Sequence, residues 1–290
     1  MPPLTVLRAA RPLAIDPGGR RREDGSMDDR SYEHLLVKRE GDIVTVTLNR
    51  PDKRNALSHE LMVELTDATR AVGRSDALGM VVAANGPVFS AGHNFGDMLG
   101  ASFDEARDLL DVCATMMTTL QAIPQVVCAK VHALATAAGC QLVASCDLAV
   151  AARSAAFALP GGKGGLFCHT PLVAVSRNLP AKRALELALT GDPIDAATAA
   201  DWGLINRAVP DDELDAAVDD LMRRATRGSA SSKALGKRTF YGQVDLDQSK
   251  AYEYATEVMA AGVTTADGQE GIASFLEKRR PDFARPRARD

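Results

Sequence analysis

Two runs of small residues could do chemistry through their backbone rather than through side chains. One is Phe89-Ser-Ala-Gly-His93, here named the first donor turn, and the other is Leu134-Ala-Thr-Ala-Ala-Gly-Cys-Gln141, the second donor turn. The second leads straight into an apolar segment that suits a helix, whose free N–H groups and positive dipole end attract an anion. Two such turns in one chain predict a pair of backbone N–H groups that together stabilise an oxyanion.

The elements around these turns alternate between strands and helices. The β-branched run after Glu40-Gly-Asp42 predicts the second of two strands within residues 34–49, and Ser58 has the side chain of a helix N-cap. Further strands are expected at 80–84 and 126–131, each leading toward a donor turn, and helices at 103–122 and 265–279. Beyond residue 171 the pattern is almost wholly helical. This order predicts an α/β fold.

Composition and charge narrow the class of protein. The chain has 290 residues, 46% of them hydrophobic and 25% charged, which allows one large globular domain or two. A net charge of −4 gives no broad attraction to nucleic acid or to an anionic membrane. No apolar run reaches the roughly 18 residues that a membrane span needs. We therefore expect neither nucleic acid nor a membrane as a partner.

The five cysteines and the N-terminus bear on the compartment. The cysteines lie in apolar surroundings without a C-x-x-C pair, which indicates reduced thiols and a cytoplasmic protein. Residues 1–31 are expected to form a disordered extension, and Met27 is an alternative start. A mitochondrial location is the alternative if this extension is a transit peptide. The histidines show no metal-ligand spacing, so no metal site is expected.

Four blocks in this order resemble the crotonase (enoyl-CoA hydratase/isomerase) superfamily. They are residues 48–57, 89–93, 138–147 and 267–281, and the likeness runs from about residue 33 to 283. It implies a crotonase-like ββα superhelix at 32–225 and a helical C-terminal trimerisation region at 226–290, assembled as a homotrimer or hexamer. Residues 133–142 and 165–171 look like one particular subgroup of the family.

The resemblance also implies a substrate and a site. The substrates would be acyl-CoA thioesters of lipid metabolism, with coenzyme A as part of the substrate and no separate cofactor. The thioester carbonyl would accept hydrogen bonds from the backbone N–H groups of His93 and Ala138. The residues implied in substrate binding are Lys53, Ala56, Leu57, Ala91, His93, Asn94, Phe95, Gly96, Ala138, Phe275 and Lys278, the last two reaching the coenzyme A of a neighbouring subunit.

The chain departs from the family where hydratases carry two glutamates. Gln141 stands at the first of these positions, and Gly161, after Pro160, stands at the second. Hydration needs a base to activate water and an acid to protonate the α-carbon, and neither residue transfers protons at neutral pH. We therefore expect inefficient hydration. Restoring both glutamates should recover some of it if the pocket is otherwise intact.

Several residues allow two interpretations. His93 could use its imidazole or only its backbone N–H. His169, beside Cys168, could replace the lost acid or base, or simply pack at a helix N-terminus. Asp97 could point into the pocket or cap the next helix. Asp147 follows a buried helix and is expected to accept hydrogen bonds from backbone N–H groups in the core.

Three kinds of function remain open. The first is an enzyme that uses the two backbone donors without the glutamates, for decarboxylation, thioester hydrolysis or isomerisation. The second is a catalytically silent acyl-CoA binder that regulates lipid metabolism. The third is an interaction protein that uses only the scaffold, against which the retained donor turns argue. Among substitutions near the donors, Ser90→Ala is expected to be mild by comparison with Ala138→Val, because Ser90 is not a donor itself.

Overall fold

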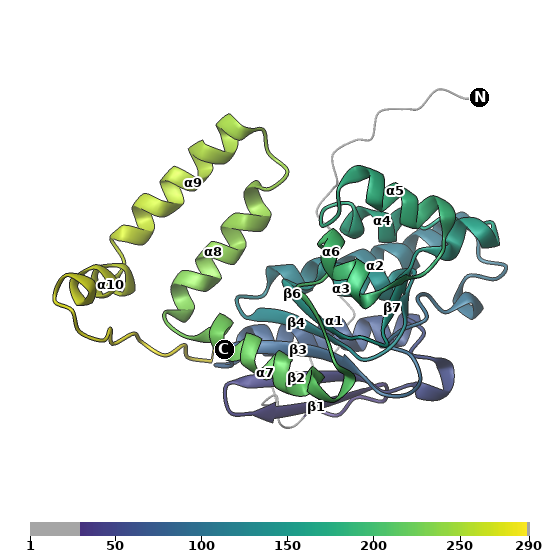
Figure 1. Cartoon of the computed structure of the whole chain (residues 1–290), viewed down its shortest axis with the longest axis horizontal. Helices are drawn as coiled ribbons and strands as arrows, with labels where there is room; N and C mark the ends of the chain where they lie inside the picture. The colour runs from purple at the N-terminus through teal and green to yellow at the C-terminus, as the bar shows by residue number, and fades with distance from the viewer. Residues whose placement is uncertain (1–29, 289–290) are drawn as a thin grey trace, which may run out of the picture. The chain divides into compact units, whose positions relative to one another are not determined.

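A six-stranded sheet forms the centre of the computed structural model, which describes residues 30–288 (Figure 1). Its spatial order is β1 (Leu35–Glu40), β2 (Ile43–Leu48), β3 (Gly79–Ala84), β4 (Val126–Val131), β6 (Leu148–Ala152) and β9 (Arg207–Val209). β1 pairs antiparallel with β2, and every other pairing is parallel. Most of the expected N-terminal extension, 1–31, lies outside the described residues.

The parallel sheet is covered on both faces. Val81 of β3 packs with Leu214, Val218 and Met222 of α7 (Leu214–Thr226), whereas the alternate residue Met80 is buried without belonging to this cluster. Because successive strand residues point to opposite faces, apolar packing must exist on both sides. The expected α/β fold is confirmed.

The predicted starts of α1 and α2 are confirmed. The helices before α7 are α1 (His59–Arg74), α2 (Phe103–Ala122), α3 (Ala138–Ser145), α4 (His169–Val175), α5 (Ala181–Thr190) and α6 (Ala196–Trp202). The Ser58 side chain accepts a hydrogen bond from the Leu61 N–H, which confirms it as the N-cap of α1. α2 spans the predicted residues and begins with a capping box of Ser102 and Glu105.

The expectation of an almost wholly helical chain beyond residue 171 is partly wrong. β9 extends the main sheet, and β8 (Ile194–Asp195) joins β5 (Ala135–Thr136) and β7 (Ala156–Ala158) in a second sheet. β8 has two residues and β9 has three, so neither is long enough to show the alternation by which a strand is recognised. β8 and β9 can be recognised as strands only from their pairing with β7 and β6.

The C-terminal region consists of α8 (Ala230–Gln243), α9 (Gln248–Val263) and α10 (Ala266–Leu276). α8 and α9 lie side by side (Figure 1), and neither contains a fully buried residue. No helix in the described part of the chain is both long and apolar enough to cross a membrane.

One ion pair anchors α8 to the sheet. The Lys237 ammonium lies 2.7 Å from a carboxylate oxygen of Asp147, with side chains only 9% and 14% exposed. It also donates to the carbonyl groups of Leu120 and Gln125. Burial lowers the pKa of Lys237 and raises that of Asp147, because each charge loses water.

Asp147 plays the part expected of it. Its carboxylate accepts hydrogen bonds from the Val127 N–H of β4, at 2.7 Å, and from the Tyr241 hydroxyl of α8, at 2.9 Å. A buried carboxylate needs such donors to offset its lost hydration. Asp147 therefore joins the central sheet to the C-terminal helices.

Replacing Lys237 with Met should cost about 3–5 kcal/mol of the free energy of unfolding, because Asp147 is left as an unpaired buried charge. The matched control is Lys250→Met on α9, whose pair with Asp247 is exposed and should contribute below about 1 kcal/mol. Denaturant unfolding of both variants at one protein concentration measures the difference. Equal costs would show that the buried pair does not anchor α8.

Candidate active site

The first donor turn pairs with the segment before α1. The Leu57 N–H donates to the Gly92 carbonyl at 2.7 Å, and the Asn94 N–H donates to the Leu57 carbonyl at 3.2 Å, which makes Leu57 and His93 a parallel bridge. In such a pairing the residue between the two bonded groups turns its own N–H to the opposite side. The His93 N–H therefore points away from Leu57, and no group of the described residues accepts a hydrogen bond from it.

The second donor turn is strained. Ala137, the N-cap of α3, has φ 51° and ψ −119°, a left-handed conformation that favours glycine. Its N–H donates to the Ala158 carbonyl and its carbonyl accepts from the Gln141 N–H, so the peptide is held at both ends. Ala138 follows as the first residue of α3, where an N–H has no acceptor within the helix.

The two turns contact each other through two glycines. A Cβ at Gly92 would lie 3.1 Å from the Ala138 nitrogen, and a Cβ at Gly139 would lie 2.5 Å from the Ser90 carbonyl oxygen. The Thr136 N–H donates to that same Ser90 oxygen at 3.0 Å. Gly92, the residue before His93, therefore lies against Ala138, so the two donor turns pack directly on each other.

Two buried polar residues, Ser90 and Asn55, hold the first donor turn in place by hydrogen bonds. Neither of these supporting roles was predicted from the sequence. The Ser90 hydroxyl donates to the Asn55 carbonyl at 2.8 Å and accepts from the Gly92 N–H. The Asn55 side chain accepts from the Arg50 N–H and donates to the carbonyl groups of two loop residues after β3, Asn85 and Val88. Removing the Ser90 hydroxyl would leave the buried Asn55 carbonyl without this donor, so Ser90 has a structural role although it is not itself a backbone donor of the site.

Gln141 is a buried residue of α3 whose side chain faces α2. Its side chain is 5% exposed, and its amide oxygen lies 4.0 Å from the Cys113 thiol of α2. Burial raises the pKa of the Cys113 thiol to about 12, so this neighbour stays protonated at neutral pH. Neither group can act as a base there.

Gly161 belongs to the short 3-10 helix η4 (Pro160–Gly164), which follows β7. A Cβ at this position would lie 2.1 Å from the Leu166 carbonyl oxygen and 2.8 Å from the Cys168 sulfur. The returning segment 166–168 therefore fills the space that a side chain would need. The expectation that restored glutamates recover hydration is not supported, because this part of the pocket is closed by backbone.

The His93 ring is largely buried. Burial lowers its pKa, and the nearby Asp97 carboxylate partly opposes this shift, so the imidazole is neutral at pH 7. Its Nε2 has no hydrogen-bond partner among the described residues.

Asp97 does not cap the next helix. Its carboxylate accepts from the His59 N–H at 3.0 Å and from the Asn94 side chain at 2.7 Å. It thus satisfies the first N–H of α1, a helix that lies earlier in the chain, whereas Ser102 caps the next helix.

His169 is the first residue of α4, is exposed, and packs against Phe167 with ring centres 5.1 Å apart. The preceding Cys168 is buried, and this burial raises its thiol pKa. His169 therefore fits the interpretation as a residue that packs at the N-terminus of α4. It fits less well as one half of an acid–base pair with Cys168.

The expected substrate-binding residues fall into two groups. The first surrounds the first donor turn and includes the exposed Lys53 and Phe95, with Ala91 held by a hydrogen bond from its N–H to the Arg54 carbonyl. Phe275 and Lys278 lie at the end of α10 and just beyond it, both exposed, Phe275 by 81%. No group of three or more potential metal ligands occurs in the residues that the structure describes.

Comparisons with known proteins agree with this architecture. The family described as enoyl-CoA hydratase/isomerase matches residues 38–286. Enoyl-CoA hydratase domain-containing protein 3, mitochondrial, of Rattus norvegicus is 42% identical over 254 residues, covering 87% of this chain and 85% of its own. The subgroup that residues 133–142 and 165–171 resemble is the one to which this relative belongs, so the resemblance to that subgroup is confirmed.

Two crystal structures show the same fold. An enoyl-CoA hydratase of Mycobacterium smegmatis is 40% identical with a TM-score of 0.83, covering 86% of this chain and 98% of its own. The human enoyl Coenzyme A hydratase domain-containing protein 3 is 38% identical with a TM-score of 0.80, covering 86% and 99%.

Replacing Gly161 with Ala should cost about 1–3 kcal/mol of stability, because the added methyl group meets a backbone oxygen. Gly164→Ala in the same 3-10 helix is the control, since nothing lies within 4 Å of its Cβ position. Thermal unfolding compares the two. If Gly161→Ala is as stable as Gly164→Ala, the space is open and a carboxylate could return.

Proposed function

Because the chain belongs to the enoyl-CoA hydratase/isomerase family, we propose that it binds acyl-CoA thioesters and holds the thioester carbonyl with the backbone N–H groups of His93 and Ala138. The observation that supports this proposal is the contact between the two donor turns, each of which carries a backbone N–H group without an acceptor among the described residues. Coenzyme A is part of the substrate, so no separate cofactor is proposed.

Two such donors favour the transition state over the ground state. A thioester carbonyl oxygen gains a full negative charge only when an enolate or a tetrahedral intermediate forms, and fixed N–H groups stabilise that charge most. Each donor is worth roughly 10²–10³ in rate in enzymes of this kind. The positive φ of Ala137 supports this role, because backbone strain of this kind is often retained where a functional site is pre-organised.

The reaction that fits is one that needs an oxyanion donor but not two carboxylates. Decarboxylation, thioester hydrolysis and isomerisation all meet this condition, within fatty-acid and acyl-CoA metabolism. The second candidate is a catalytically silent acyl-CoA binder. It is favoured by the protonated thiol beside Gln141 and by the backbone that fills the position of the second glutamate.

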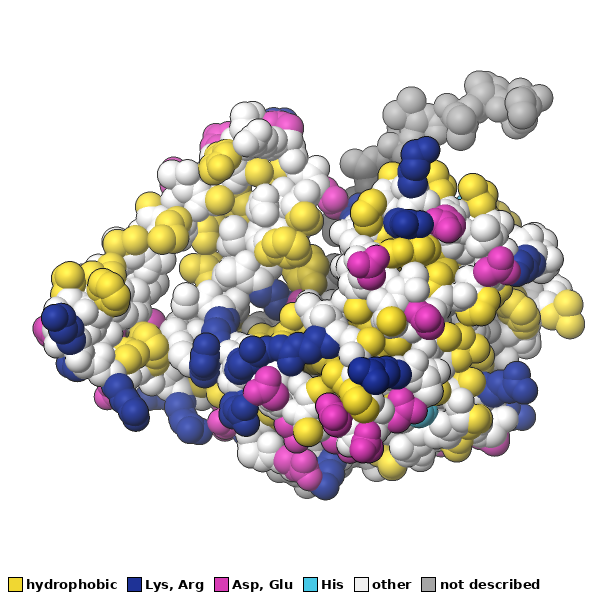
Figure 2. All heavy atoms as spheres, in the orientation of Figure 1, with side chains coloured by type: hydrophobic (Ala, Val, Ile, Leu, Met, Phe, Trp, Pro, Cys, Tyr) yellow, Lys and Arg dark blue, Asp and Glu magenta, His cyan; other side chains and the backbone are white. Residues whose placement is uncertain are grey.

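We also propose that the chain assembles with itself as a homotrimer or hexamer. Large hydrophobic side chains are exposed along the C-terminal helices, and Figure 2 shows such side chains over α8 and α9. They include Phe240, Val244, Tyr252, Met259, Ile272, Phe275 and Leu276. An apolar surface of this extent is typical of an interface, and Phe275 and Lys278 would then serve a neighbouring subunit.

For location, the five buried, unpaired thiols favour the cytoplasm. The rat relative's name includes the word mitochondrial, which makes the mitochondrion the alternative.

Ala138→Val should abolish acyl-CoA binding or turnover, because a β-branched side chain enters the space where the carbonyl must come within about 3 Å of the N–H. Isothermal titration with butyryl-CoA measures binding, and thermal unfolding shows whether the variant stays folded. Ala216→Val, on the exposed side of α7, is the control. A folded Ala138→Val protein that binds like its parent would remove the oxyanion-hole proposal.

Hydration of crotonyl-CoA should be slow even where the thioester binds. Each missing acid or base is worth about 10²–10⁴ in rate, and the loss of enoyl absorbance over time measures the reaction. Rapid hydration that disappears in His169→Ala would show that His169 supplies the proton transfer instead.

Light scattering of the purified chain at micromolar concentration should give the mass of a trimer or hexamer. Phe275→Asp should shift the mass toward the monomer, because a charge at an apolar interface is unfavourable. A monomeric parent protein would contradict the assembly.

A further inference from the structure

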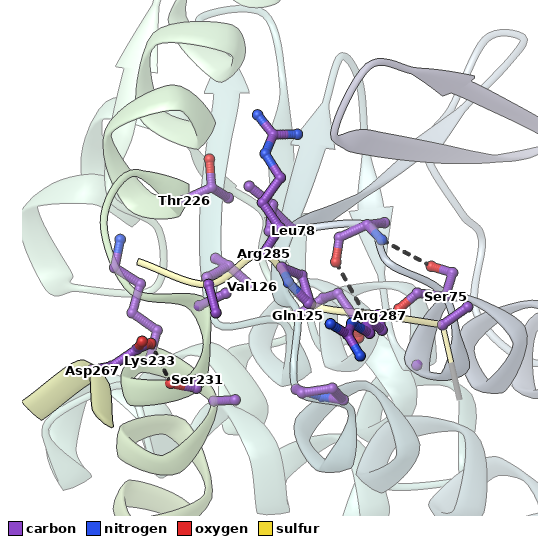
Figure 3. Close-up of a pocket in the computed structure, with 18 residues that line it drawn as sticks. Ser75, Leu78, Gln125, Val126, Thr226, Ser231, Lys233, Asp267, Arg285 and Arg287 are labelled. Carbon is purple, nitrogen blue, oxygen red and sulfur yellow. Dashed lines mark hydrogen bonds between the residues drawn. The ribbon is translucent and has the colours of Figure 1, made fainter. Parts of the chain in front are cut away.

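A cavity of about 390 Å³ is shown in Figure 3. It lies at the opposite end of the sheet from the donor turns. β3 and β4 begin beside it, at Gly79 and Val126, whereas the donor turns follow the far ends of these strands. Its walls come from the end of α1, the start of α8, Asp267 of α10 and the C-terminal segment 284–288. None of the residues expected to bind the acyl-CoA lines it.

Gln125 supplies a buried acceptor to this cavity. Its side chain is 5% exposed, and its amide nitrogen donates to the carbonyl groups of Ser75 and Ala77. This fixes which way the amide faces. Its Oε1 accepts no hydrogen bond from the described residues. A buried carbonyl oxygen without a donor is unfavourable, so a partner that supplies one is expected.

The charged side chains of the cavity are mostly occupied by other groups. Asp267 accepts from the hydroxyls of Ser229 and Ser231, and Lys233 donates to carbonyl groups at the end of α7. Arg285 pairs with Asp42.

Arg287 is different. Its guanidinium has no hydrogen bond or ion pair with any described residue, and it lines the cavity together with Gln125 (Figure 3). Three cations and one carboxylate line the cavity, so its charge favours an anion.

We propose that this cavity binds a small oxyanion, either a phosphate or a hydroxy-carboxylate, that also carries an O–H group. The oxyanion forms two parallel hydrogen bonds with the Arg287 guanidinium, which has the planar geometry for this contact. The O–H group donates to Gln125 Oε1. The volume falls within the range of small-molecule pockets.

The O–H requirement gives a test that leaves Gln125 unchanged. Inorganic phosphate carries an O–H at pH 7 and sulfate does not, and glycolate and acetate form the same contrast for carboxylates. Isothermal titration of the full chain should show phosphate or glycolate binding at least about tenfold more tightly than its partner without the O–H. The tighter of these two then identifies which oxyanion the site takes.

Matched variants place the binding in this cavity. Arg287→Ala should weaken it about tenfold, whereas Arg280→Ala, an exposed arginine outside the cavity, should not change it. Binding should also survive Lys53→Ala, because Lys53 belongs to the proposed coenzyme A site. The proposal fails if neither phosphate nor glycolate binds at millimolar concentration, if sulfate binds as well as phosphate and acetate as well as glycolate, or if Lys53→Ala abolishes binding while Arg287→Ala does not.

Discussion

The close approach of two backbone segments, at Gly92 and Gly139, is the constraint on which the site depends. Any side chain at either glycine would collide with the opposite turn, so the two turns can pack together only because these positions have no Cβ. The surrounding hydrogen bonds of Ser90 and Asn55 hold the first turn against the segment before α1. The parallel sheet fixes the distance between the strands that lead into the two turns.

The positions of the two missing glutamates differ physically. At Gln141 the side chain keeps nearly the shape of a glutamate in a buried setting, and only its ability to transfer a proton is lost. At Gly161 the volume itself is gone, since the Leu166 carbonyl and the Cys168 sulfur occupy it. The space at Gly161 is therefore closed to any side chain, whereas the space at Gln141 already holds one of nearly the size of a glutamate.

Local patterns predicted much of the fold and the backbone donors. Ser58 could be recognised as a cap and residues 103–122 as a helix because both signals depend on neighbours in sequence. The role of Asn55 could not be predicted, since its partners Asn85 and Val88 lie thirty or more residues away. Asp97 was misjudged for the same reason: it satisfies a helix 38 residues earlier in the chain. The closed space at Gly161 depends on the path of a loop, which no side-chain pattern records.

The anchor of α8 has a consequence for the order in which the molecule forms. The acceptors of Lys237 are Leu120 and Gln125, close together in the chain before β4, and Asp147, directly before β6; these two places adjoin one another only when β4 and β6 pair in the sheet. Before that sheet exists, a lysine on an isolated helix has no reason to leave water. We therefore expect the C-terminal helices to attach to the sheet only after it has formed, so that the part of the chain that carries the donor turns folds before the part that carries α8.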